Sequence, residues 1–430
     1  MTTASERPKP LTAMLMEEVV RRENLLSALK KVRTNKGSPG IDGMTVEELP
    51  DYLKKQWPRI REQLLCGDYI PQPVKRVTIP KPGGGTRELG VPVARDRFIQ
   101  QAILQVLTPL LDPTFSPYSY GFRPGKSAHQ AAEQAKKYVA EGYAWVVDCD
   151  LEKFFHDILM GRLAKRTEDK RLLKLIRRYL QAGVMVHGVV QERWEGTPQG
   201  GPLSPVLSNL LLDELDKELE RRGHRFCRYA DDCNVYVKTK RAGERVFDSI
   251  ERFLEKRLKL RVNREKSAVA PCHERGFLGF SFTKGKVLKI KLSSKALRGV
   301  KYRVKAISRR SRGVSMDQVI QQLNIYLKGW MQYYRIVETS TTFPNLDSWI
   351  RRRLRCFMAK QWIKNCHTRY KNLMAMGVHG RDVASFAASR KGPWAMSNMK
   401  PMKVAMPNRF FEQRGLLSLS NQHRLVGKTS

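Results

Sequence analysis

Three aspartates stand at the ends of two short apolar segments that lie far apart in the sequence. Asp150 ends the segment 144–150, and Asp231 and Asp232 lie at the turn of a hairpin expected over 226–237. Carboxylates from two strands supply the oxygen ligands that hard divalent cations prefer. Two such ions, held about 3.5–4 Å apart, activate a hydroxyl nucleophile and neutralise a triphosphate leaving group. The pattern therefore indicates metal-assisted nucleotidyl transfer.

The surroundings of these aspartates argue against a solvated hairpin tip, which is the common reason for an Asp pair at a turn. The pair at 231–232 lies between apolar positions and is followed by Val235 and Val237. A carboxylate beside an apolar strand is costly to desolvate without a cation. Asp148 shares a strand face with Asp150, because side chains alternate along a strand.

The elements that would position these residues can be predicted from periodicity and turn signals. Helical spacing of apolar residues predicts helices over 11–33, 45–65 and 97–111. The segment 74–91 is typical of a β-hairpin with a glycine tip at 83–85. These glycines are not a P-loop, because no Lys-Ser/Thr follows them. From about residue 294 onward the pattern is helical and basic.

The chain is strongly basic, and the charge is uneven. It has 80 Lys and Arg against 41 Asp and Glu, a formal net charge of +39. Residues 291–430 hold 28 basic and 5 acidic residues, so this third has the densest positive charge. A polyanionic partner is therefore expected. Nucleic acid is favoured over anionic membrane, because no basic amphipathic helix stands alone.

Cysteine usage and the N-terminus indicate the compartment. The seven cysteines contain no C-x-x-C pair, which argues against a structural zinc site and a secreted disulfide framework. Residues 1–8 contain no apolar signal region, and no apolar run approaches the length of a bilayer span. We therefore expect a cytoplasmic protein without a membrane partner, with two to three domains for its 430 residues.

Ordered motifs carry a resemblance to a known family. Tyr229-Ala-Asp-Asp232 resembles the Y-x-D-D box of reverse transcriptases. Further segments resemble, in the same order, the blocks of bacterial group II intron-encoded reverse transcriptase/maturases; they are 37–43, 79–81, 87–90, 119–125, 150–155, 196–205, 263–267, 277–280, 327–334 and 349–355. Each block alone is a weak signal, but the ordered set is specific and runs from about residue 20 to about residue 420.

The resemblance implies an α+β fold of the right-hand polymerase type. Fingers and a palm with an antiparallel sheet would be followed by an all-α basic thumb/maturase domain. The implied regions are an N-terminal extension with the start of the fingers at 1–70, fingers and palm at 71–290, and an RNA-binding thumb/maturase domain at 291–430. The chain resembles the class C form, which lacks an endonuclease domain, so second-strand cleavage is not expected.

The resemblance also implies a metal site. Asp150 and Asp231 match the family's metal ligands, and Asp232 matches the second Asp of its pair. The backbone carbonyl of Leu151 would be a further ligand. Together these residues would hold two Mg²⁺ ions. Asp148 does not match a catalytic position of the family, so a structural role is expected for it.

Five other positions match nucleotide-binding residues of the family. Phe155 matches a bulky steric gate that favours dNTPs, and Gln199 lies in the template and nucleotide block. Lys81 and Arg87 match fingers residues that grip the triphosphate, and Lys266 matches a late palm lysine near it. Arginine offers phosphate a planar fork and lysine a point charge. Surface ion pairs are the alternative for Lys81 and Arg87.

The thumb contributes candidate RNA contacts. Four arginines in five positions cannot all be buried or paired, which favours phosphate contact; they are Arg351, Arg352, Arg353 and Arg355. The thumb aromatics have helical spacing and are expected in the core rather than stacked on RNA; they are Trp330, Tyr333, Tyr334, Trp349 and Trp362.

One segment departs from the family pattern. His156 and Asp157 follow Phe155 directly, where about four more residues are usual, and they are expected to start a helix. The shortened connection bears on the geometry of Phe155 and on polymerase competence.

Taken with its motifs, the chain is expected to be an RNA-directed DNA polymerase that binds its group II intron RNA, aids splicing and copies the intron into DNA during retrohoming. The expected partners are the intron RNA, an RNA template with a DNA primer, target DNA and dNTPs. Two alternatives stay open. One is a splicing-only maturase with impaired polymerase, and the other is a related reverse transcriptase used in host defence or DNA repair.

Overall fold

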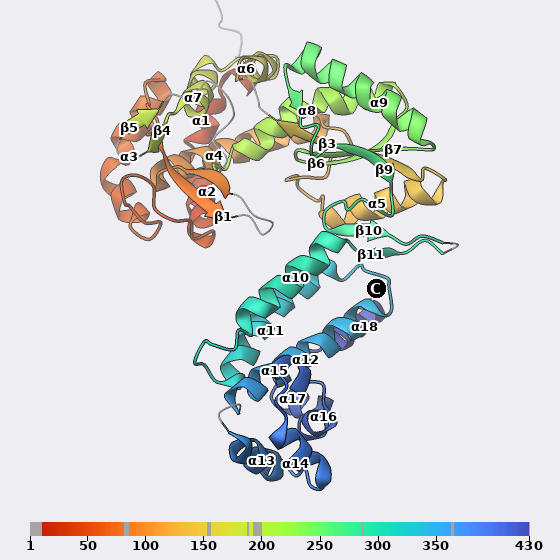
Figure 1. The fold of residues 1–430 in the computed structure, drawn as a ribbon. Helices are drawn as coiled ribbons and strands as arrows, with labels where there is room; N and C mark the ends of the chain where they lie inside the picture. Colours follow the sequence, from red (N-terminus) through yellow and green to blue (C-terminus); the bar gives the residue numbers. More distant parts are fainter. Residues whose placement is uncertain are drawn as a thin grey trace, which may run out of the picture. The chain divides into compact units, whose positions relative to one another are not determined.

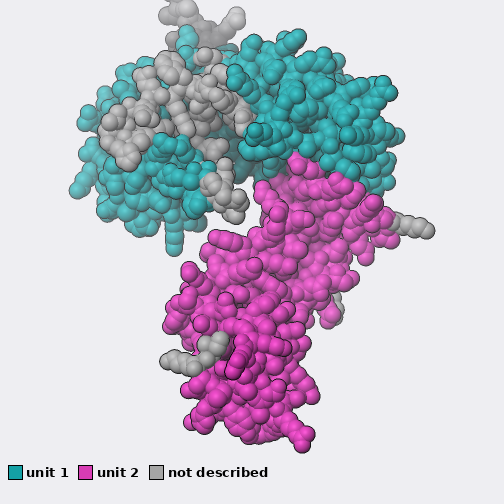
Figure 2. All heavy atoms as spheres, in the orientation of Figure 1, with its two compact units in different colours: residues 1–272 teal, residues 273–430 magenta. Residues whose placement is uncertain are grey.

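The computed structural model describes residues 11–80, 86–152, 156–186, 189–191, 200–285, 287–362 and 365–429. The chain divides into two units, residues 1–272 and 273–430, which Figure 2 draws in teal and magenta. This division lies before the boundary expected between residues 290 and 291. Strands β10 (Phe280–Phe282) and β11 (Ile290–Leu292) pair with each other inside the second unit.

Helices dominate the N-terminal part of unit 1 (Figure 1). They are α1 (Leu15–Val19), α2 (Arg22–Thr34), α3 (Leu49–Cys66) and α4 (Ala94–Leu111). The single helix expected over 11–33 is broken, because Arg21 takes an extended conformation with ψ 137° and precedes a new helix start. Asn24 ties α2 to α4, since its Nδ2 donates to the Ala102 carbonyl at 3.1 Å.

Unit 1 also contains a four-stranded sheet, in the order β2-β1-β4-β5. β1 (Val74–Pro80) and β2 (Thr86–Val91) pair antiparallel, which confirms the hairpin expected over 74–91. β4 (Val184–Val186) runs parallel to β1 and antiparallel to β5 (Val189–Gln191). The hairpin tip at 81–85 lies outside the described residues.

A five-stranded antiparallel sheet carries the aspartates. Its central strand β3 (Trp145–Glu152) pairs on one side with β7 (Asp232–Val237), which pairs in turn with β6 (Arg225–Tyr229). On its other side β3 pairs with β8 (Arg261–Val262) and β9 (Ala268–Pro271). The hairpin expected over 226–237 is thereby confirmed.

Helices α5 (Ala128–Ala140), α8 (Ser204–Arg221) and α9 (Lys240–Phe253) pack around this sheet, as Figure 1 shows. Gly243 lets α9 approach the strands closely, because a Cβ there would lie 2.5 Å from the Val269 side chain. The remaining elements of unit 1 are α6 (His156–Ala164), α7 (Lys170–Gln181), the short helices η1 (Leu11–Ala13) and η2 (Asp112–Thr114), and the π-helical turn η3 (Leu254–Leu258).

Unit 2 consists of the β10–β11 pair followed by helices. The helices are α10 (Ser294–Ile307), α11 (Met316–Tyr334), α12 (Thr342–Gln361), α13 (Cys366–Ala375), α14 (Arg381–Ala388), α15 (Pro393–Met396), α16 (Lys400–Ala405), α17 (Asn408–Gln413) and α18 (Leu419–Thr429). Ser315 forms a capping box with Gln318 at the start of α11. The buried carboxylate of Asp347 accepts from the Leu419 and Ser420 nitrogens at 2.9 and 3.0 Å, which satisfies the exposed donors at the start of α18.

The expected fold class is confirmed in its coarse form: the chain mixes helices with sheets that are largely antiparallel. The basic helical region expected from residue 294 onward is confirmed as well. Within the described ranges, no helix combines the length and the hydropathy that crossing a bilayer requires.

The structure predicts which cysteines react. Cys66 and Cys366 are exposed, and the other five thiols are buried. Burial raises the pKa of Cys272 to about 12 and raises the pKa of Cys149 still further. Because the thiolate is the nucleophile, iodoacetamide at mildly alkaline pH should label Cys66 and Cys366 in the native chain. Peptide mass spectrometry checks this, and denaturation should make all seven thiols reactive. Native labelling of Cys149 would contradict the packing of β3.

Candidate active site

The β6–β7 turn presents two of the three aspartates. Tyr229 and Asp232 form the last pair of the hairpin, so Ala230 and Asp231 make a two-residue loop. Ala230 has φ 57°, the left-handed conformation that such tight hairpin turns require. Asp231 and Asp232 are both exposed. The hairpin therefore places two carboxylates at its accessible end.

The third aspartate lies on the neighbouring strand at the same level. Asp150 of β3 is the register partner of Asp232 of β7. Directly opposite residues in an antiparallel pair have Cβ atoms about 4.5–5.5 Å apart and point to the same face. The structure thus brings Asp150 and Asp232 together and leaves Asp231 one position away on the turn.

A short loop on the other side of β3 completes the surroundings of Asp150. β8 and β9 both pair with β3, and the loop 263–267 between them lies beside Asp150. The Asn263 nitrogen donates to the Asp150 carbonyl at 2.9 Å, and the Asp150 nitrogen donates to Ser267 Oγ at 3.0 Å. Lys266 Nζ lies 3.2 Å from Asp150 Oδ2. The backbone of Asp150 is thus held on this side while its carboxylate contacts a cation.

This donor set fits a hard divalent cation in its chemistry. Asp150, Asp231 and Asp232 offer only oxygen, which suits Mg²⁺ better than softer metals. The Lys266 ammonium contacts the Asp150 carboxylate, so this carboxylate already has a positive charge beside it. No three His, Cys, Asp or Glu side chains among the described residues already lie close enough to hold a metal.

Several residues of the predicted site fall where the structure says little. Lys81, Phe155 and Gln199 lie outside the described residues. Arg87 pairs with Ile79 in the β1–β2 hairpin, and Leu151 pairs with Val262 across β3 and β8, but only their backbones are described. Helix α6 begins at His156, which confirms the helix start expected there.

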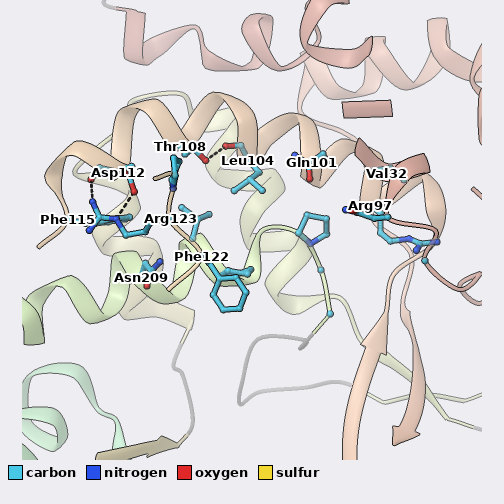
Figure 3. Close-up of a pocket in the computed structure, with 18 residues that line it drawn as sticks. Val32, Arg97, Gln101, Leu104, Thr108, Asp112, Phe115, Phe122, Arg123 and Asn209 are labelled. Carbon is cyan, nitrogen blue, oxygen red and sulfur yellow. Dashed lines mark hydrogen bonds and ion pairs between the residues drawn. The ribbon is translucent and has the colours of Figure 1, made fainter. Parts of the chain in front are cut away.

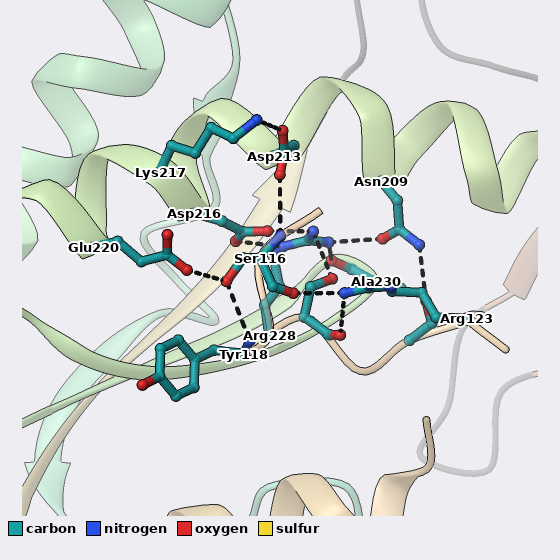
Figure 4. A network of polar contacts seen from close by, with 12 residues as sticks. Ser116, Tyr118, Arg123, Asn209, Asp213, Asp216, Lys217, Glu220, Arg228 and Ala230 are labelled. Atoms are coloured by element: carbon teal, nitrogen blue, oxygen red, sulfur yellow. Dashed lines mark hydrogen bonds and ion pairs between the residues drawn. The ribbon is translucent and has the colours of Figure 1, made fainter. Parts of the chain in front are cut away.

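Arg228 is fully buried, and three segments of unit 1 share its guanidinium (Figure 4). Nε and Nη2 donate to the two carboxylate oxygens of Asp216 on α8, at 2.7 and 2.6 Å. Nη1 donates to Asn209 Oδ1 and to the Ala230 carbonyl, both at 2.9 Å. Nη2 also donates to Ser119 Oγ at 2.8 Å. The Arg228 guanidinium thereby links the aspartate-bearing turn to helix α8 and to the segment that contains Ser119.

Arg228 and Asp216 form an ion pair in which both side chains are fully buried. Burial lowers the pKa of Arg228, but the carboxylate of Asp216 more than offsets this and raises it overall. Burial raises the pKa of Asp216, and the charge of Arg228 opposes that rise. Arg228 had no expected role, although a charged residue directly after the apolar Phe226 and Cys227 in a strand requires a buried partner.

The segment 119–125 packs on the aspartate-bearing turn. Gly121 has no room for a side chain, since a Cβ would lie 2.4 Å from the Ala230 nitrogen. Asn209 Nδ2 donates to the Gly121 carbonyl at 2.8 Å. The Phe122 ring lies 5.9 Å from the Tyr229 ring and is 63% exposed. A large, mostly exposed aromatic ring therefore lies beside Tyr229, at the start of the aspartate-bearing turn.

A cavity of about 480 Å³ lies beside this segment (Figure 3). Residues of α2, α4, the segment 119–125 and the start of α8 line it, together with Gly200 and Gly201. A Cβ on Gly200 would lie 2.5 Å from the Gly90 carbonyl, and one on Gly201 would lie 2.4 Å from Gln100 Oε1. Close approach of other chain segments explains the paired glycines.

The predicted RNA-contacting arginines all lie on α12 in unit 2. Arg355 is 9% exposed, and its Nε donates to the Met406 carbonyl at 2.9 Å. Because Arg355 is buried, the other three arginines are the more accessible candidates for RNA contact. Arg351, Arg352 and Arg353 are partly exposed.

Only one of the five thumb aromatics expected in the core is buried, and Trp330, Tyr334 and Trp349 are half-buried. Trp330 lies 4.7 Å from Tyr334 and 6.3 Å from Phe343, measured between ring centroids. Trp362 is buried. Tyr333 is partly exposed but stacks on Phe280 at 5.5 Å.

Comparison with known families and proteins gives consistent matches. Residues 79–282 match the family model described as reverse transcriptase (RNA-dependent DNA polymerase), and residues 297–377 match the group II intron maturase-specific domain. Protein YkfC of Escherichia coli (strain K12) is 32% identical over 321 residues, which cover 64% of this chain and 84% of that protein.

Two intron-encoded relatives are longer. The group II intron-encoded protein LtrA of Lactococcus lactis subsp. cremoris is 34% identical over 195 residues, 44% of this chain and 32% of that protein. The putative COX1/OXI3 intron 2 protein of Saccharomyces cerevisiae is 34% identical over 206 residues, 46% of this chain and 24% of that protein. The chain thus spans most of YkfC but at most a third of these two relatives.

Proposed function

The chain belongs to the group II intron-encoded reverse transcriptases and maturases, and from this premise we propose that it is an RNA-directed DNA polymerase that also binds its intron RNA and aids splicing. One observation carries the polymerase assignment. Asp150 and Asp232 are register partners on adjacent strands, with Asp231 next to them on an accessible turn. This arrangement supports a carboxylate site open to a primer terminus and a nucleotide.

Asp150 and Asp231 are the proposed metal ligands, with Asp232 and the Leu151 carbonyl in support. Two Mg²⁺ ions bound there would activate the primer 3′-hydroxyl and neutralise the triphosphate. Lys266 lies within reach of Asp150 and is proposed to exchange that contact for a phosphate oxygen of the nucleotide.

The remaining roles follow the chain's own motifs. Lys81 and Arg87 are proposed to hold the triphosphate from the β1–β2 hairpin, and Phe155 to exclude a ribose 2′-hydroxyl. Gln199 is proposed to contact the incoming nucleotide. The cavity beside Phe122 is the proposed path of the template strand, because an exposed aromatic ring offers a stacking surface to an unpaired base.

In the proposed architecture, residues 1–70 start the fingers, 71–290 form fingers and palm, and 291–430 form the basic thumb/maturase region. The five-stranded sheet is the candidate palm, and the helices from α10 onward are the candidate thumb. Intron RNA, an RNA template with a DNA primer, target DNA and dNTPs are the proposed partners. Copying the intron at a DNA target during retrohoming is the proposed biological outcome.

Primer extension tests the polymerase assignment. With an RNA template, an annealed DNA primer, dNTPs and Mg²⁺, the purified chain should synthesise full-length cDNA, measured with a labelled primer. A chelator should abolish synthesis, and omission of the RNA template should leave the primer unextended. A well-folded parent chain that makes no cDNA would overturn the assignment.

A splicing-only maturase is the second candidate, and the shortened connection after Phe155 favours it. It predicts that the chain accelerates self-splicing of its host intron while primer extension stays at background. Measuring both activities on one preparation separates the two functions, because the polymerase proposal requires cDNA in the same tubes.

A further inference from the structure

A cleft on unit 2 has the chemistry of a nucleotide site. Its volume is about 370 Å³, and it is lined by Lys305, Arg310, Trp349, Arg353, Cys356 and Trp394. These residues come from α10, the chain that follows it, α12 and α15. The cleft thus joins three cations and two tryptophans, and none of the described residues that line it carries a carboxylate.

Two of the three cations of the cleft, Arg310 and Arg353, donate to neutral groups. Arg353 donates from Nη2 to the Ser308 carbonyl at 3.1 Å and from Nε to Ser308 Oγ at 3.3 Å. Arg310 Nη1 donates to the thiol sulfur of Cys356 at 4.0 Å. Burial, together with the nearby charge of Arg310, lowers the pKa of Arg353. A guanidinium in such a setting gains from an added anion.

The acidic residues of this part of the chain do not line the cleft, and most of them have partners outside it. None of the five acidic residues between 291 and 430 lines the cleft; they are Asp317, Glu338, Asp347, Asp382 and Glu412. Asp317 pairs with Arg414 at 2.8 Å, and Asp382 pairs with Lys400 at 3.0 Å. Asp347 caps α18. A phosphate entering the cleft therefore displaces no internal carboxylate.

Trp394 adds a stacking surface at the edge of the cleft. The Arg352 guanidinium carbon lies 4.0 Å from the centre of its ring, and Arg352 Nη2 donates to the Trp394 carbonyl at 3.3 Å. The buried Nε of Arg352 has no hydrogen-bond partner among the described residues. Trp394 remains 38% exposed. A base stacked on this ring would extend an existing cation–aromatic stack.

We propose that this cleft binds one nucleotide of a single-stranded segment of the intron RNA. The phosphate lies between Lys305, Arg310 and Arg353, and its unpaired base stacks on Trp394. The proposal rests on the maturase function proposed above, since the matched maturase-specific region, residues 297–377, contains every lining residue except Trp394. Single-stranded RNA is favoured over duplex, because a duplex keeps its bases stacked inside.

Two substitutions test the cleft with little risk to the fold. Lys305→Gln/Arg310→Gln removes two exposed cations, and Trp394→Leu removes the stacking ring. Lys403→Gln/Arg409→Gln is the matched control, since it removes the same charges from exposed positions of unit 2 outside the cleft. All three variants are made in the full chain and compared by thermal melting, primer extension and binding.

Binding is measured with a labelled short oligouridylate and the matching oligothymidylate, over a salt titration. For oligouridylate, the double charge variant should bind about tenfold more weakly. The slope of log binding constant against log salt concentration should become smaller in magnitude by roughly 0.7 for each phosphate that is no longer neutralised. Trp394→Leu should weaken binding by roughly fivefold or more with an unchanged slope. The control should lose less affinity than the double variant, and primer extension should stay at the parent level.

The outcomes separate this proposal from the one on which it rests. If the parent chain does not bind oligouridylate, RNA binding by unit 2 fails and the cleft fails with it. If the parent binds and the cleft variants match the control, the cleft alone is overturned. An equal loss for oligothymidylate would overturn the assignment to RNA.

Discussion

Replacing Asp231 with asparagine should reduce cDNA synthesis by about 10²–10³-fold or more, because a carboxylate that supports developing charge in the transition state is removed. Asp150→Asn should have an effect of the same order. Asp231 is exposed on the turn, and the asparagine side chain has nearly the same shape, so the fold should be retained. Single-turnover primer extension measures the rate, and thermal melting checks the fold.

Asp148→Asn is the matched control for these variants. Asp148 lies on the same strand and the same face as Asp150, with Asn234 and Ala268 as its register partners. We expect it to support structure rather than catalysis, so its variant should extend primers at close to the parent rate. A parent-like rate for Asp231→Asn, or an equal loss for Asp148→Asn, would contradict the assignment of ligands.

Arg228→Met should destabilise unit 1 by about 3–5 kcal/mol, because it leaves the carboxylate of Asp216 buried without its cation. Both side chains of this pair are fully buried. Urea denaturation monitored by circular dichroism gives the change in the free energy of unfolding. Arg221→Met is the control on α8, since Arg221 pairs with Glu218 at 70% exposure and should cost at most about 1 kcal/mol.

The double variant Arg228→Met/Asp216→Leu separates stability from positioning. Replacing both charges with apolar groups of similar volume should recover most of the stability. Primer extension should nevertheless stay low, since methionine cannot donate to the Ala230 carbonyl and hold the aspartate-bearing turn. Recovery of both stability and activity would mean that Arg228 does not position the turn. A destabilisation below about 1 kcal/mol for Arg228→Met alone would contradict the buried pair.

The aspartate site could be predicted from sequence to the extent that its determinants are local. The tight hairpin and the apolar strands are encoded in short windows, and the register of β3 with β7 then brings Asp150 to Asp232. The break between α1 and α2 could not be predicted, because periodicity continues across Arg21 and only its extended backbone reveals the interruption. The metal-binding, nucleotide-binding and RNA-binding roles of all the predicted site residues remain predictions.

Longer-range contacts could not be read from the sequence. Arg228 finds its partners on α8 and at Ser119, which is 109 residues away along the chain. Arg355 of α12 donates to Met406, 51 residues further on. A spacing of four arginines in five positions tells which residues share a helix, but not which helix face a later segment will cover. Such pairings depend on tertiary packing. The sequence separation between the partners follows no regular period, so it cannot be recognised in the sequence.

The buried pair also bears on how this chain can change over generations. A lineage that replaced Arg228 alone would pass through a form with an uncompensated buried charge. That form would lose about 3–5 kcal/mol of its free energy of unfolding. That destabilisation takes a large share of the roughly 5–15 kcal/mol by which a typical domain is stable. Ser119, Asn209 and Asp216 all meet the same guanidinium, so drift at each of these positions is coupled to the others. Positions 216 and 228 should therefore be inherited together or replaced together.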